Sequence, residues 1–195
     1  MEQLNNRFVS RCGWTGNSEV MLRYHDHEWG KPEKNNDTRL FEFLVLETAQ
    51  AGLSWLIVLK KREDYRKAYR GFLPQNVAKF NKTEKENLLK NPGIIRNEKK
   101  INSSIQNAKA FLKVQEKFGS FSDYLWHFTS GLSISKGWKE DSQVPDESSL
   151  SKIICQDMRQ RNFTFVGPKI IHSYLQAIGV INDHIKDCFR FAELV

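Results

Sequence analysis

Residues 24–30 read Tyr-His-Asp-His-Glu-Trp-Gly, which places two imidazoles, two carboxylates and two large aromatic rings within seven positions. The apolar members do not recur at the spacing of an amphipathic helix or of a half-buried strand, so packing alone does not explain this run. It combines groups that can ligate a metal, transfer a proton and stack on a flat ring. The sequence therefore predicts a functional site at residues 24–30.

Two pairs of metal-binding side chains lie near opposite ends of the chain. Cys12 and His25 form the first pair, and His184 and Cys188, four positions apart, form the second. On a helix, the second spacing would place both side chains on one face. Two cysteines with two histidines suit a closed, tetrahedral structural zinc site, which here would tie the two ends of the chain together. Spacing alone leaves a second interpretation open, in which the cysteines are buried thiols and the histidines are solvated.

Flat aromatic side chains accompany one carboxylate in an apolar setting. Glu47 lies in the run Leu-Val-Leu-Glu-Thr-Ala, where a buried charge is costly unless it is paired or functional. Trp14, Tyr24, Trp29 and Trp55 lie near predicted turns. Stacked rings with one carboxylate suit a flat polar ligand such as a nucleobase, including a cationic one. Any single tryptophan, taken alone, is more often a core residue.

A Gly-Pro-Lys turn separates two predicted helices near the C-terminus. Gly167 permits a tight turn, and Pro168 suits the first position of a helix. The backbone amides of that helix N-terminus, with the charge of Lys169, could bind a DNA phosphate as in a helix-hairpin-helix. Residues 91–96, followed by Lys99 and Lys100, form a second candidate of this kind. An ordinary helical turn is the alternative for both.

The bulk composition favours a nucleic-acid partner. The 195 residues carry 30 Lys+Arg against 23 Asp+Glu, a net charge of +7, and basic proteins often bind polyanions. The run of residues 60–62, Lys-Lys-Arg, is interpreted mostly as a solvated face. No apolar run approaches the ~20 residues that span a bilayer, and residues 1–10 do not resemble a secretory signal. Three widely spaced cysteines argue against a disulfide framework. We therefore expect a monomer in the reducing cytoplasm.

The periodicity of the apolar residues predicts an all-α protein. Helices are expected from Asp37, with Asp37 or Thr38 as the cap, to near Gly52. No run alternates as a strand of a sheet would. The other helices are expected over residues 56–69, 84–89, 97–118, 123–128 with Ser122 as the cap, from Ser148 to before Asn162, and over 170–178.

Several linked motifs resemble the 3-methyladenine DNA glycosylase I family. They follow the order of the family from about residue 11 to 188, so the resemblance covers nearly the whole chain. The segments that carry it are residues 11–14, 24–30, 46–55, 59–65, 93–96, 163–167 and 182–188.

The resemblance implies a helix-hairpin-helix glycosylase fold, with two helical lobes and a cleft between them. It implies a single glycosylase domain over residues 11–195, and the polar residues 1–10 before it are expected to be flexible. It also implies one structural zinc ion that joins the termini. The zinc ligands implied are Cys12, His25, His184 and Cys188, and the DNA-binding residues expected at the hairpin are Gly167, Pro168 and Lys169.

The same resemblance implies the reaction. The enzyme would flip 3-methyladenine out of alkylated double-stranded DNA and hydrolyse its N-glycosidic bond, releasing the free base and leaving an abasic site without strand cleavage. Glu47 would be the catalytic residue. The family lacks the catalytic aspartate of other helix-hairpin-helix glycosylases, so Asp183 is not assigned that role. The residues implied in base binding are Tyr24, Trp29, Trp55, the nearby Trp14, and Met21, which stands where the family often has a tyrosine.

Two rival functions compete with this interpretation. A zinc-containing DNA-binding module without catalysis would explain the charge, the hairpin and the metal ligands. It would not explain Glu47 among apolar neighbours with four aromatic residues. Metal-centred catalysis is the second rival, and four protein ligands would leave no open position for a water on the ion.

Overall fold

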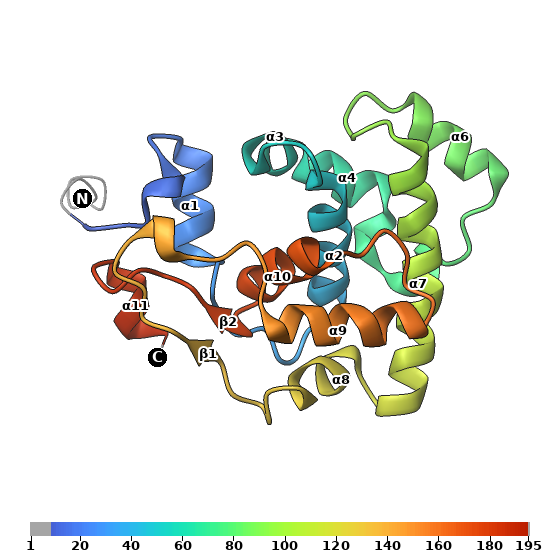
Figure 1. The fold of residues 1–195 in the computed structure, drawn as a ribbon. Helices are drawn as coiled ribbons and strands as arrows, with labels where there is room; N and C mark the ends of the chain where they lie inside the picture. Colours follow the sequence, from blue (N-terminus) through green and yellow to red (C-terminus); the bar gives the residue numbers. More distant parts are fainter. Residues whose placement is uncertain (1–8, 195) are drawn as a thin grey trace.

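The computed structural model describes residues 9–194 and confirms a mostly helical chain (Figure 1). Most of the segment 1–10, which we predicted to be flexible, lies outside the described residues. No described helix is both long enough and apolar enough to cross a membrane. The α-helices are α1 (Glu19–His27), α2 (Asp37–Gln50), α3 (Trp55–Lys60), α4 (Arg62–Ala68), α5 (Pro74–Val77), α6 (Lys82–Lys90), α7 (Glu98–Phe118), α8 (Phe121–His127), α9 (Ser149–Gln160), α10 (Pro168–Ala177) and α11 (Phe189–Glu193).

Short elements complete the chain. Two strands of two residues each, β1 (Ile134–Ser135) and β2 (Ile181–Asn182), pair in parallel. They were not expected from the sequence, because two residues are too few to show an alternating pattern. The 3-10 helices are η1 (Gly13–Thr15), η2 (Arg70–Phe72) and η3 (Asp141–Gln143).

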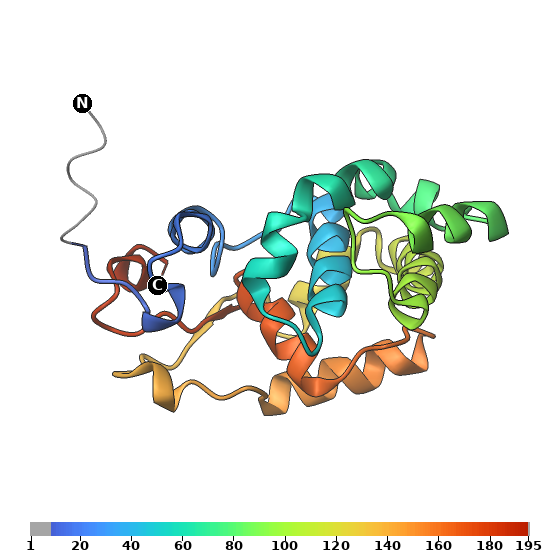
Figure 2. The same ribbon diagram turned by 90° about the horizontal axis from the view of Figure 1, so that it is seen from above.

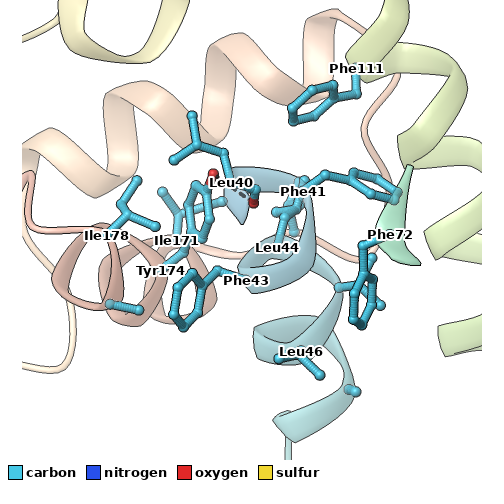
Figure 3. Close-up of a cluster of buried hydrophobic side chains, with 14 of the residues drawn as sticks. Leu40, Phe41, Phe43, Leu44, Leu46, Phe72, Phe111, Ile171, Tyr174 and Ile178 are labelled. Carbon is cyan, nitrogen blue, oxygen red and sulfur yellow. Dashed lines mark hydrogen bonds between the residues drawn. The ribbon is translucent and has the colours of Figure 1, made fainter. Parts of the chain in front are cut away.

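Helix α2 runs through the centre of the core. Every residue from Leu40 to Ala49 is buried, because α7, α8, α10 and η2 pack around the helix. Figure 3 shows its side chains between Tyr174 of α10 on one side and Phe72 of η2 on the other. The Tyr174 hydroxyl donates a hydrogen bond to the Leu40 carbonyl (3.1 Å). A helix enclosed by its neighbours holds its side chains in fixed positions, including the buried carboxylates of Glu42 and Glu47.

The predicted helix over residues 56–69 is divided into α3 and α4. The division falls at Lys61. The next residue, Arg62, is only 8% exposed and donates hydrogen bonds to Glu42 (2.8 Å) and Glu28 (2.7 Å). Our interpretation of residues 60–62 as a solvated face is therefore wrong for Arg62. Its guanidinium is a buried partner of two carboxylates.

Two of the predicted caps are wrong by one or two positions. The side chain of Asn36 caps α2, while the Asp37 carboxylate accepts hydrogen bonds from the backbone amides of Phe121 (2.7 Å) and Ser122 (2.9 Å) at the start of α8. Helix α8 is itself capped by Ser120 and not by Ser122. A carboxylate beside a helix N-terminus satisfies free amides and the helix dipole, so Asp37 connects α2 to α8.

The two ends of the described chain meet on one side of the molecule (Figures 1 and 2). The backbone after α1 bonds to the end of α10, with Gly30 N donating to Gln176 O and Glu33 N to Ile178 O (3.0 Å each). Gly179 has a φ of +73°, and a Cβ there would lie 2.4 Å from the Lys31 carbonyl carbon. Only glycine permits this approach.

The end of α2 is held by a lysine from α7. Lys100 Nζ donates to the carbonyl oxygens of Ala49 and Ala51, at 2.7 Å each. The side chain is only 9% exposed, and burial lowers the pKa of its amine. The sequence placed Lys100 near a candidate phosphate-binding turn, but the structure directs its charge to the free carbonyls of a helix C-terminus. The lysine thereby fixes the turn between α2 and α3.

We expect Lys100→Met to lower the free energy of unfolding by about 2 kcal/mol, because hydrogen bonds from a charged donor contribute about 1.5–3 kcal/mol. Urea denaturation measures this difference. The exposed neighbour Lys99 supplies the control, and Lys99→Met should leave stability unchanged. Equal stabilities of the two variants would contradict the assigned role of Lys100.

Candidate functional site

A cavity of about 350 Å³ lies among residues from both halves of the chain. This volume is at the lower end of the range for small-molecule sites, ~300–1,000 Å³. The lining residues from the N-terminal part are Trp14, Tyr24, Trp29, Glu47, Gln50 and Trp55, and those from the C-terminal part are Asp141, Val144, Pro145, Asp146, His172, Ser173, Gln176 and Asp183. The structure thus brings together five of the six residues predicted for catalysis and base binding.

Glu47 is a buried carboxylate without a protein partner. It is only 5% exposed, and no hydrogen bond or ion pair to it is found among residues 9–194. Burial alone raises the pKa of Glu47 to about 8, from an ordinary 4.5. Glu42 on the same helix is equally buried but pairs with Arg62 and Arg66. Glu47 is therefore the carboxylate of α2 that remains free to bind a ligand.

Four aromatic residues surround the cavity side of Glu47. The Trp14 and Trp29 rings meet edge to face with centroids 4.9 Å apart, and the Tyr24 and Trp55 rings lie 5.3 Å apart. The indole N–H groups of Trp14 and Trp55 are buried without a hydrogen-bond partner in the described part of the chain. The residues that line the cavity therefore carry π faces, two unpaired N–H donors and one carboxylate, which are groups that suit a flat polar ligand.

A tight turn returns the chain from Glu47 to Trp55. Helix α2 ends at Gln50, whose side-chain amide donates to Leu53 O (2.7 Å). Gly52 takes a φ of +78°, as expected for a glycine after a helix. Ser54 occupies the N-cap position of α3, but its side chain makes no capping hydrogen bond. This turn places Trp55 at the start of α3, in the wall of the same cavity.

Cys12, His25, His184 and Cys188 form a buried cluster that could hold a metal ion. Their ligand atoms all lie within 4.8 Å of one another. Cys188 Sγ is 3.4 Å from His25 Nε2 and 3.3 Å from His184 Nδ1, and Cys12 Sγ is 3.5 Å from His184 Nδ1. Each end of the chain supplies two members of the cluster, and the sequence predicted all four.

The second ring nitrogen of each histidine is also fixed. His25 Nδ1 donates to the Asp26 carboxylate (2.8 Å), which Arg11 holds in turn. His184 Nε2 donates to the Trp29 carbonyl (3.1 Å). Metal-ligating histidines characteristically have such outer partners, because these orient the ring and fix its tautomer.

One local expectation for this cluster is wrong. His184 and Cys188 do not share a helix face, because they lie in the turn between β2 and α11. Asn182 Oδ1 accepts from the His184 amide (3.2 Å), and Cys188 N donates to Ile185 O (2.9 Å). These bonds shape a loop that turns both side chains toward the interior.

The aromatic wall of the cavity packs against the cysteine–histidine cluster. The Trp29 ring lies 4.5 Å from the His184 ring, and the Trp14 ring lies 5.4 Å from the His25 ring. Both tryptophans also line the cavity. Any ion held by the cluster would therefore help to fix part of the cavity wall. With four protein ligands, the ion would have no open coordination position that faces the cavity.

Met21 is the one predicted base-binding residue that the structure does not place in the cavity. It is not among the lining residues. It lies on α1, half-buried, and packs against the hydrophobic core. Its apolar side chain accounts for this position, because contact with the core removes its surface from water.

The hairpin residues lie between α9 and α10. Gly167 is the N-cap of α10, Pro168 is its first residue, and Lys169 is exposed and paired with Asp146. The hairpin is held from both sides. Arg159 donates to Val166 O (3.1 and 2.8 Å) from α9, and Asn107 of α7 exchanges two hydrogen bonds with the Thr164 backbone.

The sequence analysis assigned no role to the polar residues in the C-terminal part of the cavity wall. His172 and Gln176 lie on α10, and Asp183 follows β2. Burial by itself raises the pKa of Asp183, but hydrogen bonds from His172, Gln176 and Trp138 outweigh it and the pKa is lowered. The only available signal was a histidine within an apolar helix, which is more often an ordinary core residue.

Comparison with known proteins agrees with this geometry. The profile of the methyladenine glycosylase family matches residues 14–191. DNA-3-methyladenine glycosylase 1 of Escherichia coli strain K12 is 39% identical over 92% of this chain and 96% of its own length. The DNA-3-methyladenine glycosylase of Haemophilus influenzae is 37% identical over 92% and 97%. The 3-methyladenine DNA glycosylase I of Staphylococcus aureus, whose structure addresses 3-methyladenine recognition, superposes with a TM-score of 0.89 at 34% identity, covering 93% of this chain and 96% of that one.

These matches span nearly the whole chain and include the segments that form the cavity and the cysteine–histidine cluster. Sequence identities of 34–39% over nearly the whole chain indicate membership of the same family as well as the same fold. The chain therefore belongs to the methyladenine glycosylase family and is an enzyme of the DNA-3-methyladenine glycosylase class.

Proposed function

We propose that this enzyme flips 3-methyladenine out of alkylated double-stranded DNA and hydrolyses its N-glycosidic bond. The observation that carries the proposal is Glu47, a buried carboxylate without a partner in an aromatic cavity. Methylation at N3 makes adenine cationic, so the base leaves as a neutral molecule and needs no strong general acid. The enzyme's task is to extrude the nucleotide and to distinguish the damaged base from adenine.

Base recognition follows from the groups in the cavity. The faces of Trp14, Trp29 and Trp55 attract an electron-poor cationic ring. Glu47 accepts from the exocyclic amine or from a ring N–H, and its charged form strengthens that bond. A cationic ligand lowers the raised pKa of Glu47 again, because an opposite charge favours the ionised carboxylate. Neutral adenine carries no positive charge, so it stabilises the ionised Glu47 carboxylate less.

The products follow from the polar groups among the lining residues, which are carboxylates, an imidazole, amides and hydroxyls, with no lysine among them. These groups can hold a water at the sugar, whereas a lyase reaction needs an amine nucleophile. We therefore expect a monofunctional reaction that releases the free base and leaves an abasic site. The simplest test is release of free 3-methyladenine from alkylated duplex DNA, and a DNA-binding module without catalysis would release none.

DNA contact is proposed at the segment formed by α9, the hairpin and α10, as a helix-hairpin-helix. The amides of Lys169 and Ile170 have no acceptor within α10, because they lie in its first turn. They can bind a phosphate together with the Lys169 ammonium. The exposed Lys169–Asp146 pair is weak in water, so a phosphate can replace Asp146. The net charge of +7 supports the same partner.

We propose zinc as the ion of the cysteine–histidine cluster. Typical Zn–S and Zn–N distances of about 2.3 and 2.0 Å give sulfur–nitrogen edges of about 3.5 Å in a tetrahedron. The edges observed are 3.3–3.5 Å. The donor set and the outer partners of both histidines fit a closed structural site. Zinc would stabilise the junction of the two chain ends, and the residues in the cavity carry out the reaction.

Zinc content provides the first test. Protein purified without chelator should contain one zinc per chain, and Cys188→Ser should lose it and melt at a lower temperature, because one thiolate ligand is removed. Cys155→Ser is the control, since Cys155 is buried but outside the cluster. Metal-free wild-type protein by elemental analysis would refute the zinc assignment.

Glu47→Gln should reduce excision but not the stability of the fold. One hydrogen bond to a charged group contributes about 1.5–3 kcal/mol, so base release should fall by about 10- to 150-fold. Single-turnover release of 3-methyladenine measures this change. Normal excision by a variant that melts lower than the wild type would mean that Glu47 is structural and that the pocket is misplaced.

Glu47 should also make stability depend on pH. With the pKa of Glu47 at about 8 in the folded state and 4.5 ordinarily, the folded protein retains a proton that the unfolded chain loses. The stability of the wild type therefore falls as pH rises through this window. Glu47→Gln removes the effect, so its advantage should grow from pH ~5 to pH ~9, by at most about 5 kcal/mol. Glu42→Gln should be destabilising instead, because Arg62 loses its buried partner.

Lys169→Ala tests the hairpin. Loss of one phosphate contact should weaken binding about equally on all sequences and reduce the salt slope by about one unit. Fluorescence anisotropy with duplex DNA at several salt concentrations measures both quantities. Lys113→Ala, an exposed lysine on α7, is the control. If Lys169→Ala binds like this control, the phosphate is held elsewhere.

A further inference from the structure

His172 lines the cavity and has one ring nitrogen without a hydrogen-bond partner in the described part of the chain. It lies on α10, is only 2% exposed and lines the same cavity as Glu47. Its Nδ1 has no hydrogen-bond partner among the described residues. A buried polar atom without a partner destabilises the folded protein. A cavity that retains such an atom can use it to bind a ligand or a water.

The other ring nitrogen of His172 is fixed by Asp183. Asp183 is only 2% exposed, and it accepts hydrogen bonds from Trp138 Nε1 (2.7 Å) on Oδ1 and from Gln176 Nε2 (2.8 Å) on Oδ2. His172 Nε2 lies 3.3 Å from the same Oδ2. The carboxylate can only accept, so Nε2 carries the hydrogen. In the neutral ring Nδ1 is then an acceptor with a free lone pair.

The surroundings indicate what Nδ1 can accept from. Asp141, Asp146 and Asp183 line the cavity together with Glu47. A phosphate would be repelled by so many carboxylates, whereas a water or a positively charged sugar would be favoured. Asp183 is occupied by its own donors, so it acts through the histidine. An aspartate that fixes the tautomer of a histidine is the arrangement by which serine hydrolases prepare a general base.

We propose that His172 is the general base of the glycosylase reaction, an inference that rests on the proposed function. Nδ1 accepts a hydrogen bond from the water that attacks the sugar C1′. As the C1′–O bond forms, the C1′–N9 bond breaks and its electron pair neutralises the cationic base. The proton of the water passes to Nδ1, and the imidazolium is stabilised by Asp183 until solvent takes the proton. Glu47 and the aromatic rings hold the base, and His172 holds the nucleophile.

His172→Gln tests this assignment. The glutamine amide can still donate to Asp183 from near the position of Nε2, but it offers no base at the position of Nδ1. With enzyme in excess over methylated duplex DNA, the single-turnover release of 3-methyladenine should fall by about 10²-fold, the lower end for general base catalysis. Affinity for free 3-methyladenine, followed by tryptophan fluorescence, and the melting temperature should match the wild type. His127→Gln, at an exposed histidine of α8, should change none of these.

The outcomes separate this inference from the proposed function. If the wild type releases 3-methyladenine and His172→Gln releases it as fast, His172 is not the base and the proposed function stands. A slower release that accompanies an equal loss of base affinity, or a lower melting temperature, would assign His172 to binding or structure and overturn the inference. No release by the wild type would refute the proposed function itself. If His172→Gln does not fold, His172→Phe is compared by the same three measurements.

Discussion

The desolvation of one carboxylate is the constraint around which the core is built. Glu47 lies on a helix whose residues from Leu40 to Ala49 are all buried, and no cation of the described chain compensates its charge. Such a group is costly, and the packing of α2 against its five neighbouring elements must offset that cost. In the proposed function, the same burial would allow Glu47 to distinguish a cation from a neutral base, because its interaction with a charge is strongest where water is excluded.

The helix that carries Glu47 also needs fixed ends. At the start of α2, the Asp37 carboxylate accepts hydrogen bonds from two backbone amides of α8. At the end of α2, Lys100 donates hydrogen bonds to two backbone carbonyls. Both contacts place a charge at the helix end whose dipole it complements. The position of Trp55 depends on them too, because it follows the turn that Lys100 holds. The core and the cavity are thus stabilised by the same interactions.

The second half of the site depends on joining residues from the two ends of the chain. Gly179, after α10, packs closely against the backbone after α1. The cysteine–histidine cluster joins the same two ends of the chain. Trp14 and Trp29 rest on the histidines of this cluster. A cavity whose walls are far apart in sequence can thereby keep a fixed width, and fixed geometry is what recognition of a flat ring requires.

The sequence by itself determined the all-α class, most of the helices and the four members of the cysteine–histidine cluster, because helical periodicity and residue type are local properties. It also indicated the buried Glu47, from its apolar neighbours. Tertiary structure alone decided that Glu42, equally buried, pairs with Arg62, and that Lys100 caps a helix instead of meeting DNA. It also decided that His172 meets Asp183. The physical reason is that a buried polar group takes its role from the partner that reaches it, and partners distant in the chain are set by packing.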